Sequence, residues 1–178
     1  MNILFIHPVM LHPCRGGIER VSDLLCCEFL KRGHNVLYLH NVQDEGRMDY
    51  SYPVSFYFFP YSVQEIEKNG VFFRYFLQEH HIDIVIDQDP LTYYKLYRFA
   101  KILRKVHIIS VIHYNPLGIY DHLSQFVMWV RGKNTMIGKI RRIARITKIP
   151  IIKYTYKQTL KADYEGILLY TDLLCLLS

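Results

Sequence analysis

Short apolar runs alternate with longer amphipathic segments along the first two thirds of the chain. The apolar runs predict buried strands at 3–6, 35–40, 54–59, 82–87 and 106–113. Between them, apolar residues recur at helical spacing and predict helices that begin at about 18, 71 and 91, the first of which ends at Gly33. Continuous apolar strands that alternate with helices predict a Rossmann-like, doubly wound parallel sheet with helices on both faces, in a single α/β domain over 1–178.

The pattern changes after Pro116. Helical spacing continues over 121–130, 136–146 and 154–171, and a last apolar run at 172–178 has strand character. A strand at the last residue predicts a domain that belongs to a longer protein or is completed by a partner chain.

Composition narrows the class of protein. About half of the 178 residues are apolar and 21% are charged, which is ordinary for a soluble globular domain. Lys and Arg exceed Asp and Glu by six, and this favours an anionic partner such as a phosphate ligand or an acidic membrane surface.

Neither a metal site nor a leader is indicated. The four cysteines show no C-x-x-C or Cys/His spacing, so we expect reduced thiols in a cytoplasmic core and no metal. The first apolar run lacks a basic segment before it and a small-residue cleavage site after it, and it is too short to span a bilayer. These features favour a cytosolic chain.

Two glycines, Gly16 and Gly17, stand where the first strand gives way to the first helix. The N-terminus of a helix presents unpaired backbone N–H groups and a positive dipole end, which together attract phosphate, and glycine lets a diphosphate come close. The pattern is neither G-x-G-x-x-G nor a P-loop. A flexible loop with a permissive helix start explains two glycines equally well, so both interpretations stay open at this point.

Several motifs resemble, in the same order, those of the N-terminal domain of GT-B glycosyltransferases of the retaining type known as family 4. The chain has "GG" followed by "ER" on the first helix, and then "RGH" before the second strand. "DIVIDQDP", "VIHYNP" and "YTDLLCLLS" are similar to later strands and turns of that family.

The resemblance implies an acceptor-binding domain that uses a UDP- or GDP-sugar, needs no metal and no cofactor, and lacks its C-terminal nucleotide-sugar domain. The acceptor would be a carbohydrate or a lipid-linked sugar, used to make surface polysaccharide or glycolipid at the inner membrane face. Alone, the domain would be inactive.

Carried over by position, the resemblance places Gly16 and Gly17 at the donor phosphates and makes His113 the catalytic residue. The remaining cleft-lining candidates are His7, His12, Asp89 and Asn115. His113 can also be a histidine satisfied at a strand end. Asp89, before Pro90, is better explained as a helix cap.

A basic stretch without acidic residues lies between Asp121 and Asp163. Its amphipathic part carries Lys139, Arg141, Arg142, Arg145 and Lys148. Such a helix binds an anionic membrane or a phosphate-rich acceptor, although an ordinary domain helix with a solvated face is the simpler alternative. We expect no nucleic-acid partner, because no reading motif accompanies the charge.

Two other functions remain as alternatives. One is a non-catalytic module of GT-B ancestry that docks on a membrane or a partner. The other is an ordinary dinucleotide-binding domain, disfavoured by the missing G-x-G-x-x-G and by Asp44, which does not stand cleanly at the end of the second strand.

Overall fold

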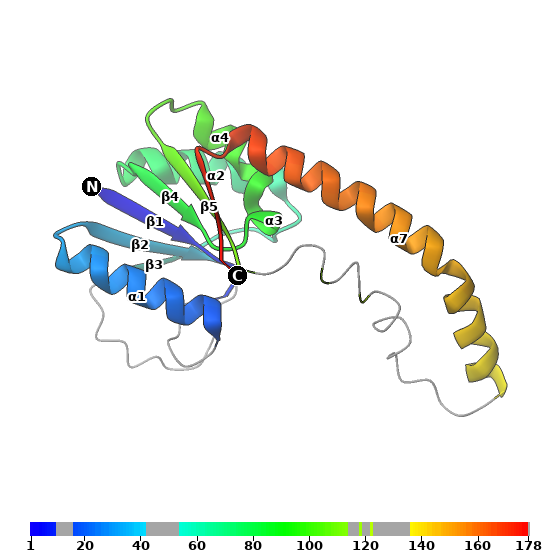
Figure 1. Ribbon diagram of the computed structural model, residues 1–178. Helices are drawn as coiled ribbons and strands as arrows, with labels where there is room; N and C mark the ends of the chain where they lie inside the picture. The colour runs from blue at the N-terminus through cyan, green and yellow to red at the C-terminus, as the bar shows by residue number, and fades with distance from the viewer. Residues whose placement is uncertain (10–15, 42–53, 114–117, 119–121, 123–135, 178) are drawn as a thin grey trace. The chain divides into compact units, whose positions relative to one another are not determined.

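The computed structural model describes residues 1–9, 16–41, 54–113, 118, 122 and 136–177, with the side chains of 136–146 left out. It divides into two compact units, 1–113 with 166–177, and 114–165. The strands of the first unit are β1 (Asn2–Ile6), β2 (Asn35–His40), β3 (Ser55–Phe58), β4 (Ile84–Asp87), β5 (His107–Ile112) and β6 (Leu173–Leu176). They form one parallel sheet in the order β3-β2-β1-β4-β5-β6 (Figure 1).

Helices cover both faces of this sheet. They are α1 (Gly17–Lys31), α2 (Ile66–Glu79), α3 (Pro90–Tyr93), the 3₁₀ helix η1 (Tyr94–Leu96) and α4 (Tyr97–Lys101). A further helix, α7 (Met136–Tyr170), belongs to the second unit except for its last residues, 166–170. The α1 helix packs on one face of the sheet, whereas α2, η1 and α4 pack on the other. The predicted doubly wound α/β fold is therefore confirmed.

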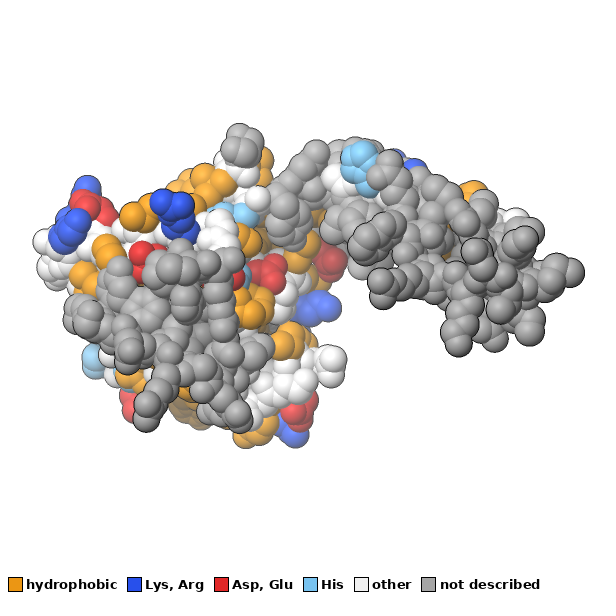
Figure 2. All heavy atoms as spheres, turned by 90° about the horizontal axis from the view of Figure 1, so that it is seen from below, with side chains coloured by type: hydrophobic (Ala, Val, Ile, Leu, Met, Phe, Trp, Pro, Cys, Tyr) orange, Lys and Arg blue, Asp and Glu red, His pale blue; other side chains and the backbone are white. Residues whose placement is uncertain are grey.

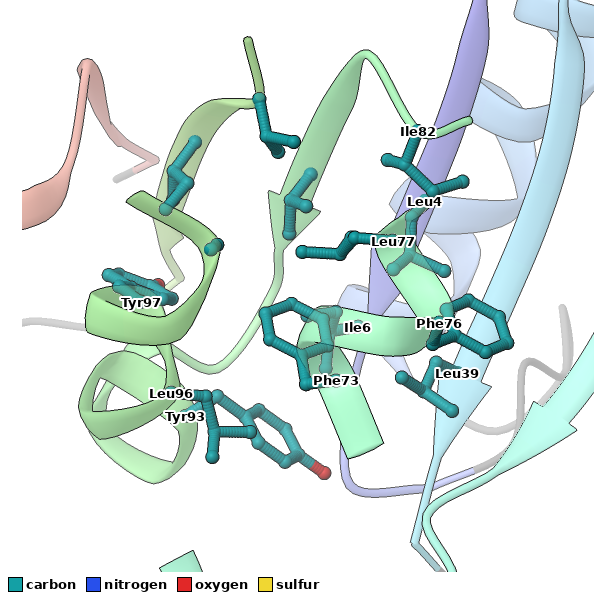
Figure 3. Close-up of a cluster of buried hydrophobic side chains, with 14 of the residues drawn as sticks. Leu4, Ile6, Leu39, Phe73, Phe76, Leu77, Ile82, Tyr93, Leu96 and Tyr97 are labelled. Atoms are coloured by element: carbon teal, nitrogen blue, oxygen red, sulfur yellow. The ribbon is translucent and has the colours of Figure 1, made fainter. Parts of the chain in front are cut away.

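Two apolar layers arise from the alternation of side chains along each strand. Ile3 and Phe5 of β1 point to the layer under α1 and meet Cys26 there. Leu4 and Ile6 point to the opposite layer, where Figure 3 shows them beneath the side chains of α2. Both faces of the central strands are thus buried, which explains why their sequences are apolar without interruption.

The region predicted as one helix from about 91 is a series of three short pieces. Tyr93, Leu96, Tyr97 and Ala100 keep helical spacing and are all buried, so the prediction of an inward apolar face is correct. Beyond Lys101 the next apolar residue, Ile102, is 60% exposed. The chain then turns through Arg104, which has a φ of 54°, and leaves the helix.

The two helices predicted at 136–146 and 154–171 are one, because α7 runs through Pro150. Proline removes a single backbone donor and crowds the carbonyl four residues earlier, but neighbouring turns keep their own hydrogen bonds. The helix predicted at 121–130 lies outside the described residues apart from His122. Among the helices that the structure describes, none is both long and apolar enough to cross a bilayer.

Candidate functional site

The carboxyl ends of β1, β4 and β5 meet at one edge of the sheet. Ile6 of β1 pairs with Asp87 of β4, and Asp87 pairs with Ser110 of β5. Strand alternation puts His7, Gln88 and His113, which follow these strands, on the side of α1. This edge lies where the strand order reverses, between β1 and β4, the position at which open α/β sheets bind their ligands.

Gln88 stands at the centre of this edge and is 1% exposed. Its backbone N–H donates to the carbonyl of Ile6 at 3.0 Å, and its side-chain Oε1 accepts a short hydrogen bond from Nε2–H of His113. Within the described chain its side-chain nitrogen has no partner. A buried amide donor left unpaired costs about 1–3 kcal/mol, so a ligand acceptor at this point would offset that cost.

The hydrogen bond to Gln88 fixes which ring nitrogen of a neutral His113 carries the proton. Because the Oε1 atom of Gln88 can only accept, Nε2 of His113 carries the proton and Nδ1 is left as the acceptor of the ring. Burial lowers the pKa of His113, and the neighbouring His7 lowers it further, while Asp89 and Glu19 act in the opposite direction. His7 is itself nearly buried, with its Nδ1 3.1 Å from the carbonyl oxygen of Val9.

The start of α1 is open to solvent. Gly16 is its N-cap residue in extended conformation, Gly17 is the first residue of the helix, and both are exposed. A Cβ atom placed on Gly17 would meet nothing within 4 Å, whereas one placed on Gly16 would lie 2.5 Å from a carboxylate oxygen of Glu19. The Glu19 carboxylate therefore lies near the N-terminus of α1, beside the place predicted for a phosphate.

Asp89 caps α3 by position but not by the usual bond. Its carboxylate accepts a hydrogen bond from the Thr92 hydroxyl at 2.7 Å, and no cap bond joins its side chain to a backbone N–H. The carboxyl group faces the histidines closely enough to affect His113. Asp89 therefore stands where a helix cap stands and also near His113, so both interpretations of this residue stay open.

Asp87 is the site residue that the sequence did not indicate. It is fully buried, and burial raises its pKa to about 8. Its carboxylate accepts hydrogen bonds from the Tyr97 hydroxyl at 2.7 Å and from the Asp89 backbone N–H at 2.8 Å. An acidic residue that closes an apolar strand was the only signal available, and its partner Tyr97 lies ten positions further along the chain.

Several predicted site residues cannot be placed. His12 and Asn115 lie outside the described residues, and the side chains of Lys139, Arg141, Arg142 and Arg145 are outside them too, although these four stand on the predicted helix. Lys148 is exposed. On the face shown in Figure 2, basic and acidic side chains are interspersed over the described surface. Among the described residues, no three or more His, Cys, Asp or Glu side chains form a group that could hold a metal ion.

No family model and no curated protein matches this chain. Solved structures similar to it include two enzymes. The enzyme WbmH of Bordetella bronchiseptica, in complex with NAD+, is 13% identical over 83% of this chain and 52% of its own, with a TM-score of 0.40. The dTDP-glucose 4,6-dehydratase of Bacillus anthracis, in complex with NAD, is 12% identical over 99% and 53%, also with a TM-score of 0.40.

The chain thus spans about half the length of these structures. At such identities and TM-scores they say nothing about the activity of this chain.

The comparisons correct two expectations. The assignment to family 4 GT-B glycosyltransferases is wrong, because no family model matches and the similar structures are NAD-bound enzymes of another kind. The expectation that no cofactor is used is wrong on the same finding, since NAD is bound in both. The motifs misled because they serve the fold: Gly33, the glycine of "RGH", has a φ of 77° that ends a helix, and Gly16–Gly17 begin one.

Proposed function

We propose that this chain binds a nucleotide along the carboxyl edge of its sheet, with the phosphates at the start of α1. The observation that carries the proposal is the buried Gln88 side-chain nitrogen, which has no partner within the described chain and belongs to the strand end at the reversal of strand order. Two exposed glycines begin α1 on the same side of the sheet. A phosphate near their backbone N–H groups would gain from the helix dipole.

Two classes of nucleotide fit the features of this edge. NAD is favoured by the strand order, which is that of dinucleotide-binding folds. A nucleotide sugar is favoured by the ten residues between Ile6, where β1 ends, and Gly17, where α1 begins, because NAD-binding folds carry the tight G-x-G-x-x-G turn here. Strand β2 ends at His40, which is fully buried, so no acidic residue that could hold a ribose ends this strand.

His113 is the group in this site best suited to take a proton from a bound substrate. Burial lowers the pKa of His113 and so favours its neutral form, in which Gln88 fixes the proton on Nε2 and Nδ1 is left to act as the base. We therefore propose an enzyme domain that acts on a nucleotide-linked substrate, because such an activity gives a role to each described residue of the edge.

Titration calorimetry on the full chain tests the proposal with NAD+, UDP, UDP-glucose and dTDP-glucose as probes. We expect one of them to bind, and Gly17→Val to weaken that binding at least tenfold while the protein stays folded, since the added side chain enters open space. Leu24→Val is the matched control, because Leu24 is an exposed residue of the same helix, away from the edge. Failure of the whole panel to bind, or equal binding by Gly17→Val, contradicts the proposal.

Gln88→Leu gives a second test. The substitution removes an unpaired buried donor, so we expect little loss of thermal stability although the bond to His113 is lost. Ligand affinity should fall about tenfold, the value of about one hydrogen bond to a charged or polar acceptor. Unchanged affinity would mean that the Gln88 amide does not meet the ligand.

A further inference from the structure

A row of buried polar groups lies beneath the carboxyl edge and crosses from β4 to the start of β6. The Tyr97 hydroxyl donates to Asp87 at 2.7 Å and lies 2.8 Å from the Ser110 hydroxyl. Ser110 in turn lies 2.8 Å from the hydroxyl of Thr171. When the Asp87 carboxyl group is ionised, Tyr97 can only donate to it, so Ser110 donates to Tyr97 and Thr171 donates to Ser110. A protonated carboxyl group would donate to Tyr97 and reverse the row.

The two oxygens of the Asp87 carboxyl group hold different parts of the molecule. Oδ2 is fixed by Tyr97 of α4, while Oδ1 accepts from the backbone N–H of Asp89. The second bond spans two residues and closes the turn in which Gln88 stands. Loss of the carboxyl group would leave a buried Tyr97 hydroxyl and the Asp89 N–H unpaired, and would free this turn.

The far end of the chain of hydroxyls is anchored as well. Asp172, next to Thr171, accepts hydrogen bonds from the backbone N–H of Ile108 at 2.7 Å and from the Lys101 ammonium at 2.6 Å. Its own N–H donates to the carbonyl of Ile108 at 2.9 Å. These bonds position Thr171 beside β5, at the far end of the row of hydrogen bonds that begins at Asp87.

We propose that Asp87 is a positioning residue of the carboxyl-edge site, which holds the turn that presents Gln88 and Asp89 to the ligand. The identity of the ligand rests on the proposed function, but the hydrogen bonds of Asp87 do not depend on a ligand. Asp87 is fully buried, and the role needs no contact between Asp87 and substrate. It acts through Gln88, whose Oε1 fixes the proton of His113.

Replacement by asparagine should preserve this role. An amide nitrogen facing Tyr97 would donate to the hydroxyl, and Tyr97, Ser110 and Thr171 can all reverse their protons in response. The amide oxygen would continue to accept from the Asp89 N–H. Alanine offers neither bond.

Two-dimensional NMR of the His113 ring in the full chain tests the inference without a ligand. In the wild type and in Asp87→Asn we expect the ring nitrogens to report a proton fixed on Nε2. In Asp87→Ala we expect that signature to be lost, giving a mixture of tautomers. Val106→Ala is the control. Val106 is buried just before the amino end of β5, so its truncation should lower stability without affecting the turn at the carboxyl ends.

A His113 signature in Asp87→Ala equal to that of the wild type would overturn the inference, and so would its loss in Val106→Ala. If Asp87→Ala does not fold, Tyr97→Phe takes its place, since it removes one of the two anchors of the carboxyl group. We then expect a shift in the same direction and of smaller size. An unchanged ring in Tyr97→Phe would overturn the inference equally.

Calorimetry with UDP and NAD+ separates this inference from the proposed function. If the wild type binds either probe, Asp87→Ala should bind it at least tenfold more weakly and Asp87→Asn within about threefold of the wild type. Binding that Asp87→Ala leaves unchanged refutes the positioning role while the proposed function stands. If the wild type binds neither probe, the proposed function fails, and the NMR signature still decides the role of Asp87.

Discussion

A carboxyl group in the core changes how stability depends on pH. Burial raises the pKa of Asp87 from about 3.8 to about 8, so between these values the native state keeps a proton that the unfolded chain has lost. Rising pH therefore favours unfolding across this window. The groups that face the carboxyl are Tyr97, Tyr93 and Asp89, and they remain in any variant at position 87.

We expect Asp87→Asn to remove that slope. Its melting temperature relative to the wild type should rise as the pH is increased from 4 to 8, because the amide cannot ionise. Thermal melts of both proteins at pH 5, 7 and 8.5 measure the difference, in which the histidines shared by the two proteins cancel. Parallel profiles would show that Asp87 does not titrate in this window.

Glu19 should affect stability and binding with opposite signs. Its carboxylate stabilises α1 through the helix dipole by about 0.3–1 kcal/mol, yet it places negative charge beside the proposed phosphate position. We expect Glu19→Gln to lower the melting temperature slightly and to raise the affinity for UDP several-fold, with the gain shrinking in high salt. Glu28→Gln makes the same change of charge near the other end of α1 and should leave affinity unaltered. A loss of affinity in Glu19→Gln would place the phosphate elsewhere.

At the scale of elements, two helical glycines should respond to alanine in opposite ways. A Cβ on Gly70 of α2 would overlap the ring of Phe99 on α4, whereas a Cβ on Gly17 would enter open space. Overpacking of this kind costs about 1–3 kcal/mol. We expect Gly70→Ala to lower the free energy of unfolding by that amount and Gly17→Ala to leave it equal or higher, as urea titrations would measure. Equal losses would show that α2 and α4 do not pack as described.

The elements differ in how far the sequence predicts them. Each of the four central strands carries its own signal, because burial on both faces demands an uninterrupted apolar run. The edge strands β3 and β6 are not buried in this way, yet all six predicted strands are present. The breaks within 90–101 and the continuity of α7 through Pro150 depend on packing and on neighbouring turns, so local spacing misplaced both.

For the site, the sequence indicated His113 through the family resemblance and His7 as a cleft candidate, and both follow strands that end at the same edge. It did not predict the row from Asp87 to Thr171, whose members are joined only by the fold.

At the scale of the molecule, the first unit contains the whole sheet and every described residue of the candidate site, while 147–165 belongs to the second unit. The parallel arrangement gathers the ends of β1, β4 and β5 at one edge, although together they span more than a hundred positions of the chain. A ligand at this edge therefore contacts segments distant in sequence, and its footprint should be discontinuous.

Hydrogen exchange with and without saturating UDP or NAD+ would map this footprint. At short exchange times, when local openings dominate, we expect slower exchange at 16–20 and 88–92, because the ligand would engage or cover those backbone N–H groups. Amides of 147–165 should exchange as before, since no residue of that segment belongs to the proposed site. Gly17→Val, exposed to the same ligand concentration, controls for effects of the ligand on the solution. Protection confined to 147–165 would move the binding site into the second unit and contradict the role given to the carboxyl edge.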